Sequence, residues 1–273
     1  MSFPLNAVEA PIRKSGIIPT LMRIRTGVQV AGLSDVGCQR ENNEDSYAYW
    51  EPSGDDQFKR IGRLAIVADG MGGHEGGQEA SRIAVEAIQQ MYAADPNGDP
   101  QTLLTAGFRE AHHRIFEHSS KDEQLHGMGT TATALAIIGE RLAYAHVGDS
   151  RLYCVRGQSI NRLTRDHSYV NRLVEDGVLT PEEAEVHPQR NILTAALGVG
   201  PEITPDAPAQ SVRVQSGDIL VLCTDGLWGL VTDDEIRDTV VKNKPQVACE
   251  MLVKMAKQRG GPDNITVQVL RVE

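Results

Sequence analysis

The chain is poor in aromatic residues, in closely spaced cysteines and in long hydrophobic runs, and each shortage excludes a class of protein. Phe, Trp and Tyr make up 4% of the 273 residues, so Leu, Val, Ile and Ala must form most of the core. Cys38, Cys154, Cys223 and Cys249 lie far apart, without CxxC spacing, and we expect reduced core thiols. No apolar run approaches the roughly 20 residues of a membrane span, and the N-terminus lacks the apolar core of a signal peptide. A cytoplasmic protein without membrane contact is therefore expected.

Positive charge is also in short supply. The 27 Lys and Arg residues face 37 Asp and Glu residues, which gives a net charge of −10. Such a balance repels the phosphate backbone of nucleic acid, so we expect no nucleic-acid partner. Hydrophobic residues make up 40% and charged residues 23% of the chain, which is typical of a protein with a packed core.

The length favours one large domain. Residues 1–26 combine prolines and basic residues without a sustained hydrophobic period, and we expect a flexible N-terminal tail there. The single domain is expected over residues 27–273. Within it, the polar stretch 164–198 is expected to run over the surface with only short helices.

Apolar alternation and short apolar runs predict strands in seven places. They are residues 28–33, 64–68, 131–138, 142–147, 151–155, 219–223 and 265–270. Helical spacing of apolar residues predicts two helices after the second strand and one before the last strand. The short turns between Thr131 and Val155 predict an antiparallel meander. Together these patterns favour an α+β fold over a doubly wound parallel sheet.

Aspartates recur where strands end. Asp69 in AIVADG, Asp149 in YAHVGDS and Asp225 in LVLCTDG each follow a buried strand, and Asp263 in GGPDN precedes the last one. Each alone is typical of a turn. Gathered at one rim, however, they would repel one another strongly, and a hard cation relieves that repulsion. Carboxylates suit Mg²⁺ or Mn²⁺, whereas zinc prefers a His and Cys spacing that is absent here.

Two such ions sharing a carboxylate generate hydroxide at neutral pH and stabilise an in-line displacement at phosphorus, which predicts phosphoester hydrolysis. The upstream cluster Arg40-Glu41-Asn42-Asn43-Glu44-Asp45 reads as a solvated loop if taken alone. Placed after the first strand, Glu44 and Asp45 could add carboxylates to the rim, and Arg40 could bind a phosphoryl group through two hydrogen bonds.

The glycines over residues 70–77 form neither GxGxxG nor a Gly-Lys-Ser/Thr terminus, so nucleotide binding is not indicated.

A series of motifs in order carries a resemblance to a known family. The motifs are RENNED at Arg40–Asp45, VADGMGGHEGG at Val67–Gly77, GMGTTATAL at Gly127–Leu135, HVGDSRLY at His146–Tyr153, TRDHS at Thr164–Ser168, CTDGLWG at Cys223–Gly229 and GGPDNITV at Gly260–Val267. From about Gly27 to Glu273 the chain resembles the metal-dependent Ser/Thr protein phosphatases of the PPM (type 2C) family, in their bacterial form. The resemblance implies a central antiparallel β-sandwich with helices on both outer faces. It also implies hydrolysis of phosphoserine and phosphothreonine by metal-bound hydroxide, without a phosphoenzyme.

The resemblance implies a centre of two Mg²⁺ or Mn²⁺ ions. Asp69 would bridge the ions, and the carbonyl of Gly70 would complete one coordination shell. Asp225 and Asp263 would hold the other ion, with Asn264 supporting the Asp263 end.

Further roles follow from the same resemblance. Glu44 would act through water, with Asp45 beside it, and Arg40 would bind the phosphate. Asp149 and Asp225 would form a third, weaker metal site. The segment near 168–195 resembles the flap that helps to select protein substrates, within the polar stretch 164–198.

The general acid stays open at the level of sequence. Animal members of the family carry a histidine where this chain has Met71. His74 follows three residues later, and a metal-bound water is an equal alternative. His167 follows Asp166, where a carboxylate–imidazole contact could orient it, and we favour a structural role for it.

Two other functions compete with protein dephosphorylation. The same centre could act on nucleotides or nucleic acid, against which the net charge counts, or the chain could be a silent relative that only binds phosphoproteins, against which the retained acidic residues count. The leading hypothesis implies phosphoprotein substrates of a cognate Ser/Thr kinase and a monomeric enzyme.

Overall fold

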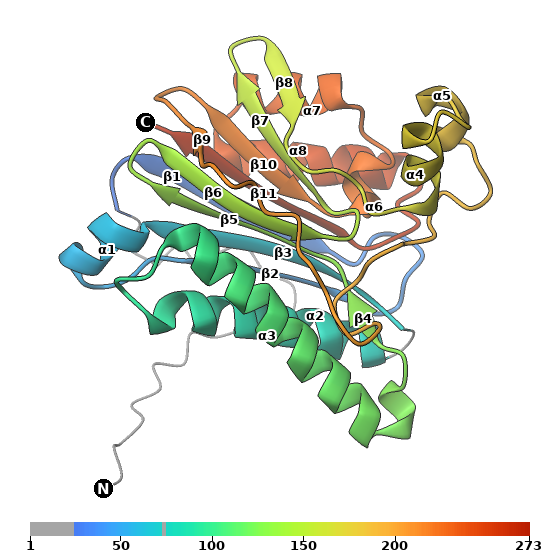
Figure 1. Cartoon of the computed structure of the whole chain (residues 1–273). Helices are drawn as coiled ribbons and strands as arrows, with labels where there is room; N and C mark the ends of the chain where they lie inside the picture. The colour runs from blue at the N-terminus through green and yellow to red at the C-terminus, as the bar shows by residue number, and fades with distance from the viewer. Residues whose placement is uncertain (1–24, 73–74) are drawn as a thin grey trace, which may run out of the picture.

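The computed structural model describes residues 25–72 and 75–273 and shows two antiparallel sheets packed face to face (Figure 1). The first sheet has the order β1 (Val28–Asp35), β11 (Ile265–Val272), β10 (Ile219–Cys223), β7 (Arg151–Arg156) and β8 (Ser159–Arg162). The second has the order β2 (Asp45–Trp50), β3 (Arg63–Met71), β5 (Ala132–Ile138), β6 (Arg141–Val147) and β9 (Val212–Arg213), with β4 (Gly129–Thr130) paired to the end of β3. This is the predicted α+β sandwich.

Helices cover the outer face of each sheet (Figure 1). α2 (Glu75–Ala94) and α3 (Pro100–Lys121) pack on the second sheet, and α7 (Asp233–Lys242) and α8 (Pro245–Gln258) lie over the first. The shorter helices are α1 (Asp55–Ile61), α4 (Tyr169–Glu175), α5 (Pro181–Glu185), α6 (Asp225–Trp228) and the 3₁₀ turn η1 (Glu123–Leu125). α4 and α5 are the short helices expected within residues 164–198. In the described ranges no helix combines the length and the apolar character that crossing a bilayer requires.

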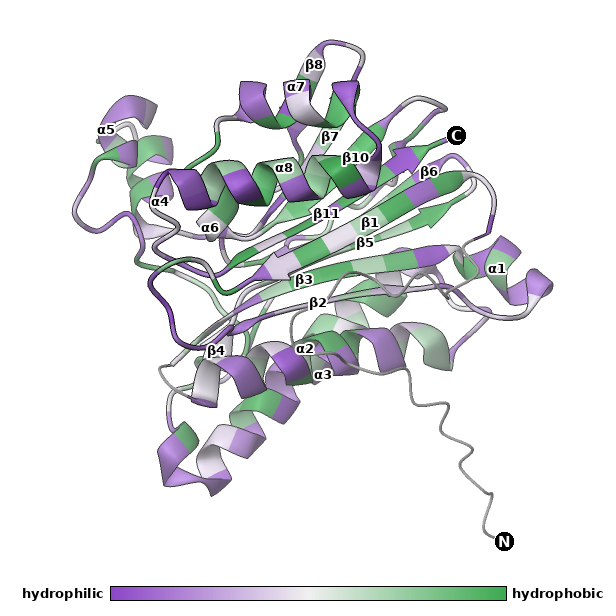
Figure 2. Ribbon diagram, turned by 180° about the vertical axis from the view of Figure 1, so that it is seen from behind, coloured by the Kyte–Doolittle hydropathy of each residue, from purple (hydrophilic) through white to green (hydrophobic). Residues whose placement is uncertain are grey.

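The strand β3 shows how the sequence builds the layers. Leu64, Ile66 and Ala68 pack in the core cluster under α2 and α3, whereas Ala65 and Val67 pack in the cluster between the two sheets. Because successive side chains of a strand point to opposite faces, a continuous apolar run is buried on both sides. Figure 2 shows the same pattern, with strands that are mostly hydrophobic and helices whose hydrophilic residues alternate with hydrophobic ones.

The predicted meander is wrong. β5 and β6 pair as expected, but β7 belongs to the other sheet, where it pairs with β10 and β8. The chain changes sheets at Gly148-Asp149-Ser150. Gly148 has a φ of +105°, a conformation that favours glycine, and a Cβ there would collide with Thr131. A short turn between two strands allows either a hairpin or a change of sheet, and the periodicity does not distinguish them.

Several other expectations need correction or lie outside the described residues. All four cysteines are free, but Cys38 is exposed in the loop after β1, whereas the other three are buried. Strand β2 and helix α7 were not expected, because β2 mixes polar and apolar residues and α7 is mostly charged. Of the predicted tail, only residues 25 and 26 are described.

Candidate active site

Aspartates from separate segments meet at one end of the sandwich. Asp69 lies near the end of β3, Asp225 follows β10, Asp263 precedes β11, and Asp149 lies where the chain changes sheets. In an antiparallel pair the end of one strand lies beside the start of its neighbour, and Asp69 is accordingly in register with Asp45 at the start of β2. The charges of the other four carboxyl groups all act on Asp69. The structure thus brings together the acidic residues that the sequence places far apart.

Asp69 and Asp225 come from different sheets, and each lies close enough to act on the pKa of the other. Asp45 accepts a hydrogen bond from the hydroxyl of Thr224 through Oδ2 (2.9 Å). In the described part of the chain, Oδ1 of Asp45 and Oδ1 of Asp225 are buried without a hydrogen-bond partner. Such atoms are available to a cation.

Burial and mutual repulsion raise the pKa of these carboxyl groups. Burial raises the pKa of Asp45 to about 7, and the charges of Asp225 and Asp263 add to the effect. The pKa of Asp69 is raised well above its usual range by burial and then by Asp45 and its neighbours. Burial also raises the pKa of Asp149 and of Asp225. Holding these groups ionised at neutral pH therefore costs folding free energy unless a positive charge binds among them.

Glycines let three backbone segments approach closely beside Asp69. The Gly70 N–H donates to the carbonyl of Glu44 (3.2 Å), and the Ser81 hydroxyl donates to the same carbonyl (2.6 Å). A Cβ at Gly70 would overlap the carbonyl of Gly77, and a Cβ at Gly77 would stand 2.5 Å from Oε2 of Glu44. The strand β3, the Glu44 loop and the first turn of α2 are packed without room for side chains at these positions.

Asn264 joins the Asp263 segment to the Glu44 loop. Its Oδ1 accepts a hydrogen bond from the Glu44 N–H (2.7 Å), and its Nδ2 donates to the carbonyls of Val36 (3.0 Å) and Asn42 (2.9 Å). Its own N–H donates to Oδ1 of Asp263 (2.8 Å). The side-chain amide of Asn264 thus fixes the backbone of Glu44, and its backbone N–H orients Asp263.

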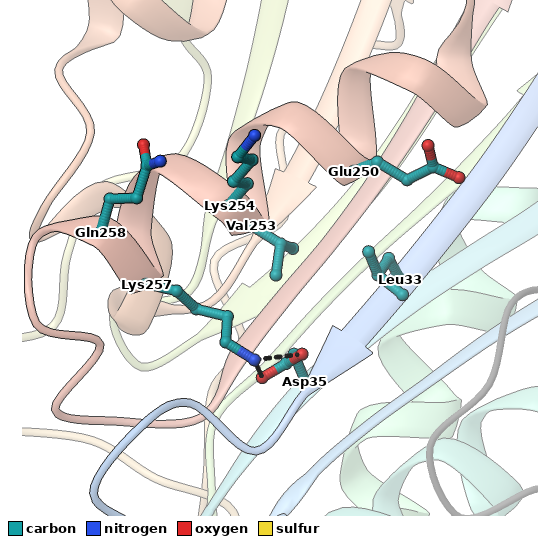
Figure 3. A pocket seen from close by; sticks show the side chains of 7 residues that line it. All are labelled: Leu33, Asp35, Glu250, Val253, Lys254, Lys257 and Gln258. Carbon is teal, nitrogen blue, oxygen red and sulfur yellow. Dashed lines mark hydrogen bonds and ion pairs between the residues drawn. The ribbon is translucent and has the colours of Figure 1, made fainter.

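Arg40 lies at the edge of the rim and is not free. Its Nη2 forms an ion pair with Oδ2 of Asp263 at 2.8 Å, while 49% of the Arg40 side chain stays exposed. The loop that leads to Arg40 is held by Asp35 at the end of β1, which pairs with Lys257 of α8 (2.8 Å; Figure 3). The Cys38 N–H adds a hydrogen bond to the carbonyl of Gly261 (2.8 Å).

The Asp149 turn is tied to the base of the stretch 164–198. Trp228 donates through Nε1 to the carbonyl of Asp149 (3.0 Å), and the guanidinium of Arg151 stacks 3.6 Å from the Trp228 ring centroid. Arg151 and Arg162 both pair with Asp166, at 2.7 and 3.1 Å. Sequence reasoning missed Trp228 and Arg151, whose only signal is their place in two of the motifs.

His167 finds a different partner from the one expected. Asp166 pairs with the two arginines, and Nε2 of His167 lies 3.1 Å from Oδ2 of Asp206. The other ring nitrogen, Nδ1, accepts a hydrogen bond from the Gly148 N–H (3.2 Å). His167 therefore links three segments of backbone, which agrees with a structural role.

The two positions considered for the general acid differ in what the structure shows. Met71 is partly buried at the end of β3, next to Gly70. His74 lies outside the described residues. The assignment of His74 stays a prediction.

A buried histidine beside the site makes stability depend on pH. Burial, and then the nearby His167, lower the pKa of His146 to about 4, and its ring bonds to Thr133 and Gly148. The unfolded chain therefore takes up a proton between pH 6.5 and 4 that the folded protein refuses, so stability is lost as the pH falls through this window. Relative to a His146→Gln variant, the wild type should lose about 2 kcal/mol between pH 7 and pH 5, measured by urea unfolding. Parallel profiles of the two proteins would contradict this account.

The carboxylate oxygens at the rim are ligands that suit a hard divalent cation. Among residues 25–72 and 75–273, no three His, Cys, Asp or Glu side chains are grouped closely enough to enclose an ion as they stand. The unpartnered oxygens of Asp45 and Asp225, whose charges act on Asp69, nevertheless offer buried carboxylate oxygens to an ion. Oxygen ligands of this kind are what Mg²⁺ and Mn²⁺ take in proteins.

Comparison with known proteins agrees with this chemistry. Residues 39–260 match the family described as protein phosphatase 2C. The chain belongs to the protein phosphatase 2C family. It is 41% identical over 252 residues to the protein phosphatase PhpP of Streptococcus pneumoniae, covering 89% of this chain and 97% of that protein. It is 37% identical over 253 residues to the serine/threonine protein phosphatase PstP of Mycobacterium tuberculosis, covering 92% of this chain and 46% of that protein.

Solved structures of protein phosphatase 2C relatives share the fold. The crystal structure of Mycobacterium tuberculosis PstP/Ppp superposes with a TM-score of 0.81 at 36% identity, covering 90% of this chain and 99% of that one. The catalytic domain of PstP in complex with two manganese ions gives a TM-score of 0.78 at 35% identity, covering 90% of this chain and 98% of that one. The predicted fold, the predicted family and the predicted class of enzyme, a protein serine/threonine phosphatase, are confirmed.

Proposed function

We propose that this phosphatase hydrolyses phosphoserine and phosphothreonine in proteins by direct attack of water, without a phosphoenzyme, using two Mg²⁺ or Mn²⁺ ions at the aspartate rim. The observation that carries the proposal is the convergence of Asp69 and Asp225 from different sheets, where the pKa values of both carboxyl groups are raised and Oδ1 of Asp225 is buried without a hydrogen-bond partner among the described residues. A pair of divalent ions removes the cost of ionising them. The manganese complex of PstP, a relative of the same family and fold, supports the choice of metal.

The ligand set that we propose uses the residues at the rim. Asp69 would bridge the two ions, with the Gly70 carbonyl, Asp225 and Asp263 as further ligands. Glu44 would act through water with Asp45 beside it, and Asp149 and Asp225 would hold a third, weaker ion. When bound, the two core ions would lower the pKa of an attacking water molecule and neutralise charge on the phosphoryl oxygens.

Arg40 is proposed to hold the phosphoryl group. Its partner in the structure, Asp263, is one of the proposed ligands, and their ion pair is half exposed and therefore weak. Once Asp263 turns its charge to a cation, the guanidinium is available to two oxygens of a phosphoryl dianion. Arg40 would thereby orient the substrate and screen the charge that develops in the transition state.

Arg40→Ala should lower kcat/KM for a phosphothreonine peptide by about 10²-fold, because a charge-assisted contact to the phosphoryl group is lost. Arg40→Lys should recover only part of this loss, since an ammonium group cannot form the two parallel hydrogen bonds that a planar guanidinium forms with two oxygens. Arg60→Ala, at an arginine of α1, is the matched control and should behave as wild type in the same steady-state assay. A wild-type kcat/KM in Arg40→Ala would remove Arg40 from the site.

A metal series on a phosphothreonine peptide tests the proposed function. Turnover should be absent in EDTA, return with Mn²⁺ or Mg²⁺, and stay absent in Asp69→Ala at every metal concentration. A parallel assay on an oligonucleotide and on a nucleoside triphosphate addresses the rival substrates, and hydrolysis of these in preference to the peptide would contradict the proposal. Turnover of the peptide that survives EDTA would contradict the metal centre.

The proposal extends to the partners of the enzyme. We infer that its substrates are phosphoproteins of a cognate Ser/Thr kinase, that it acts in the cytoplasm, and that it works as a monomer. The acidic balance of −10 supports the exclusion of nucleic acid. The flap role of residues 164–198 is supported by the contacts of Asp166 and His167 with the Asp149 turn.

A further inference from the structure

An apolar surface adjoins the aspartate rim. Asp69 and Met71 are separated by one residue of β3, and because side chains alternate along a strand, both leave β3 on the same face. Gly70, which lies between them, faces the other way: a Cβ at this position would collide with Gly77 of α2, on the opposite face of β3. The Cα atoms of Asp69 and Met71 are therefore roughly 7 Å apart. Met71 therefore lies beside Asp69, on the face of β3 opposite to the one that Gly70 turns toward α2.

Val199 completes this surface from a distant part of the chain. Its Cγ2 atom lies 2.8 Å, and the Cε atom of Met71 2.9 Å, from the point that a Cβ of residue 129 would occupy. Only a glycine at position 129 leaves room for both side chains beside it. Val199 nevertheless keeps 47% of its surface exposed. We refer to Met71 and Val199 together as the apolar lip.

The backbone just before Val199 is held in place. Leu197 exchanges two backbone hydrogen bonds with Thr130 of β4, at 2.8 and 3.1 Å, and the Gly198 N–H donates to Nδ1 of the buried His112 (3.1 Å). Thr130 in turn donates through its hydroxyl to the carbonyl of Asp69 (2.7 Å). The segment just before Val199 is thus linked to Asp69 through Thr130. An exposed apolar side chain on a fixed loop offers contact area at little cost in conformational entropy.

We propose that the apolar lip selects phosphoprotein sites that carry a large apolar residue immediately beside the phosphorylated Ser or Thr. This inference rests on the proposed function. A phosphoryl group bound at Asp69 places the neighbouring residue of the substrate within side-chain reach of Met71 and Val199, since consecutive Cα atoms are about 3.8 Å apart. A leucine side chain there covers the lip and loses contact with water, whereas a serine leaves the lip exposed.

The test compares phosphothreonine peptides that differ only at the residues flanking the phosphothreonine, with leucine or serine before it or after it. The wild type with Mn²⁺ should show a kcat/KM about tenfold higher for leucine at one of the two positions, the scale on which apolar contacts discriminate. Met71→Gln and Val199→Ser should each reduce the ratio of the leucine to the serine peptide toward one. Because the ratio is taken within each variant, a general loss of activity cancels.

The matched controls lie on the far side of the sandwich. Val247 and Met251 of α8 are 43% and 42% exposed, and Val247→Ser and Met251→Gln make the same chemical changes away from the lip. Both controls should keep the wild-type ratio. Equal turnover of all the peptides by the wild type, or an unchanged ratio in both lip variants, would overturn the lip. Failure to hydrolyse any peptide or p-nitrophenyl phosphate would instead count against the proposed function.

Discussion

Asp69→Asn is expected to lower kcat for p-nitrophenyl phosphate at saturating Mn²⁺ on the order of 10³-fold, and at the same time to raise the melting temperature of the metal-free protein. The loss of activity follows because Asp69 is the proposed bridge between the ions, and a neutral amide binds a divalent cation weakly. The gain in stability follows from burial, which raises the pKa of Asp69 well above its usual range and makes its ionised form costly in the folded state.

The sign of this second effect is fixed by linkage. A carboxyl group whose pKa is raised on folding binds its proton more tightly in the native state, so native stability falls as the pH rises through the window between the two pKa values. For Asp45 that window runs from the usual range of an aspartate up to about pH 7. The rim carboxylates should therefore lower the free energy of unfolding of the metal-free wild type as the pH rises from 5 to 7.5. The variant Asp69→Asn should show a smaller decrease over the same range.

Circular-dichroism melting in EDTA, together with steady-state kinetics in Mn²⁺, measures both effects. Added Mn²⁺ should raise the melting temperature of the wild type far more than that of Asp69→Asn, since binding to the native state stabilises it. Asp56→Asn, an exposed position on α1, is the control and should match the wild type in both assays. An Asp69→Asn variant that is as active as the wild type, or less stable in EDTA at pH 7.5, is incompatible with the site described here.

Gly226→Ala is expected to have the second largest effect, lowering the melting temperature and reducing kcat/KM by about 10²-fold or more. Gly226 follows Asp225 directly, and a Cβ there would overlap the carbonyl oxygen of Asn264. The Asp225 segment and the Asp263–Asn264 segment must then separate. Overpacking of this kind costs about 1–3 kcal/mol or more and moves two proposed metal ligands apart.

The same substitution in open space provides the comparison for Gly226→Ala. Gly54 has a negative φ, and nothing lies within 4 Å of its would-be Cβ, so Gly54→Ala should keep the wild-type activity and lose at most about 1 kcal/mol, because Gly54 is the N-cap of α1, where glycine is preferred to alanine. Thermal melting and Mn²⁺-dependent turnover of both variants give the test. If Gly226→Ala binds Mn²⁺ and turns over substrate as the wild type does, close packing of the two segments is not what positions the carboxylates.

Local patterns in the sequence were sufficient for the α+β class and for the acidic residues at the strand ends, whereas the layered sandwich was predicted from the family resemblance. A run such as Leu64–Ala68 must be buried on both faces, and an aspartate directly after it must lie at the edge of a sheet. Both conclusions depend only on residues that are adjacent in the chain, and the structure agrees with them. The family resemblance then supplied the expected role of each residue.

Contacts between distant segments could not be read in the same way. The change of sheet at Gly148 looks like a hairpin turn, and the partner of His167 proved to be Asp206 rather than the adjacent Asp166. The approach of Met71 and Val199 to the same point depends on a glycine at position 129 and on backbone pairing between Thr130 and Leu197. No period or motif encodes such pairings, because they arise only when the two sheets and their loops are assembled.

The most direct test of the metal centre is anomalous X-ray diffraction, at the manganese edge, from crystals of the full chain grown with Mn²⁺. We expect two strong peaks between the carboxyl groups of Asp69, Asp225 and Asp263, with loss of at least one peak in crystals of Asp69→Asn. Manganese peaks found only elsewhere on the protein, or none at a concentration that supports turnover, would contradict the account.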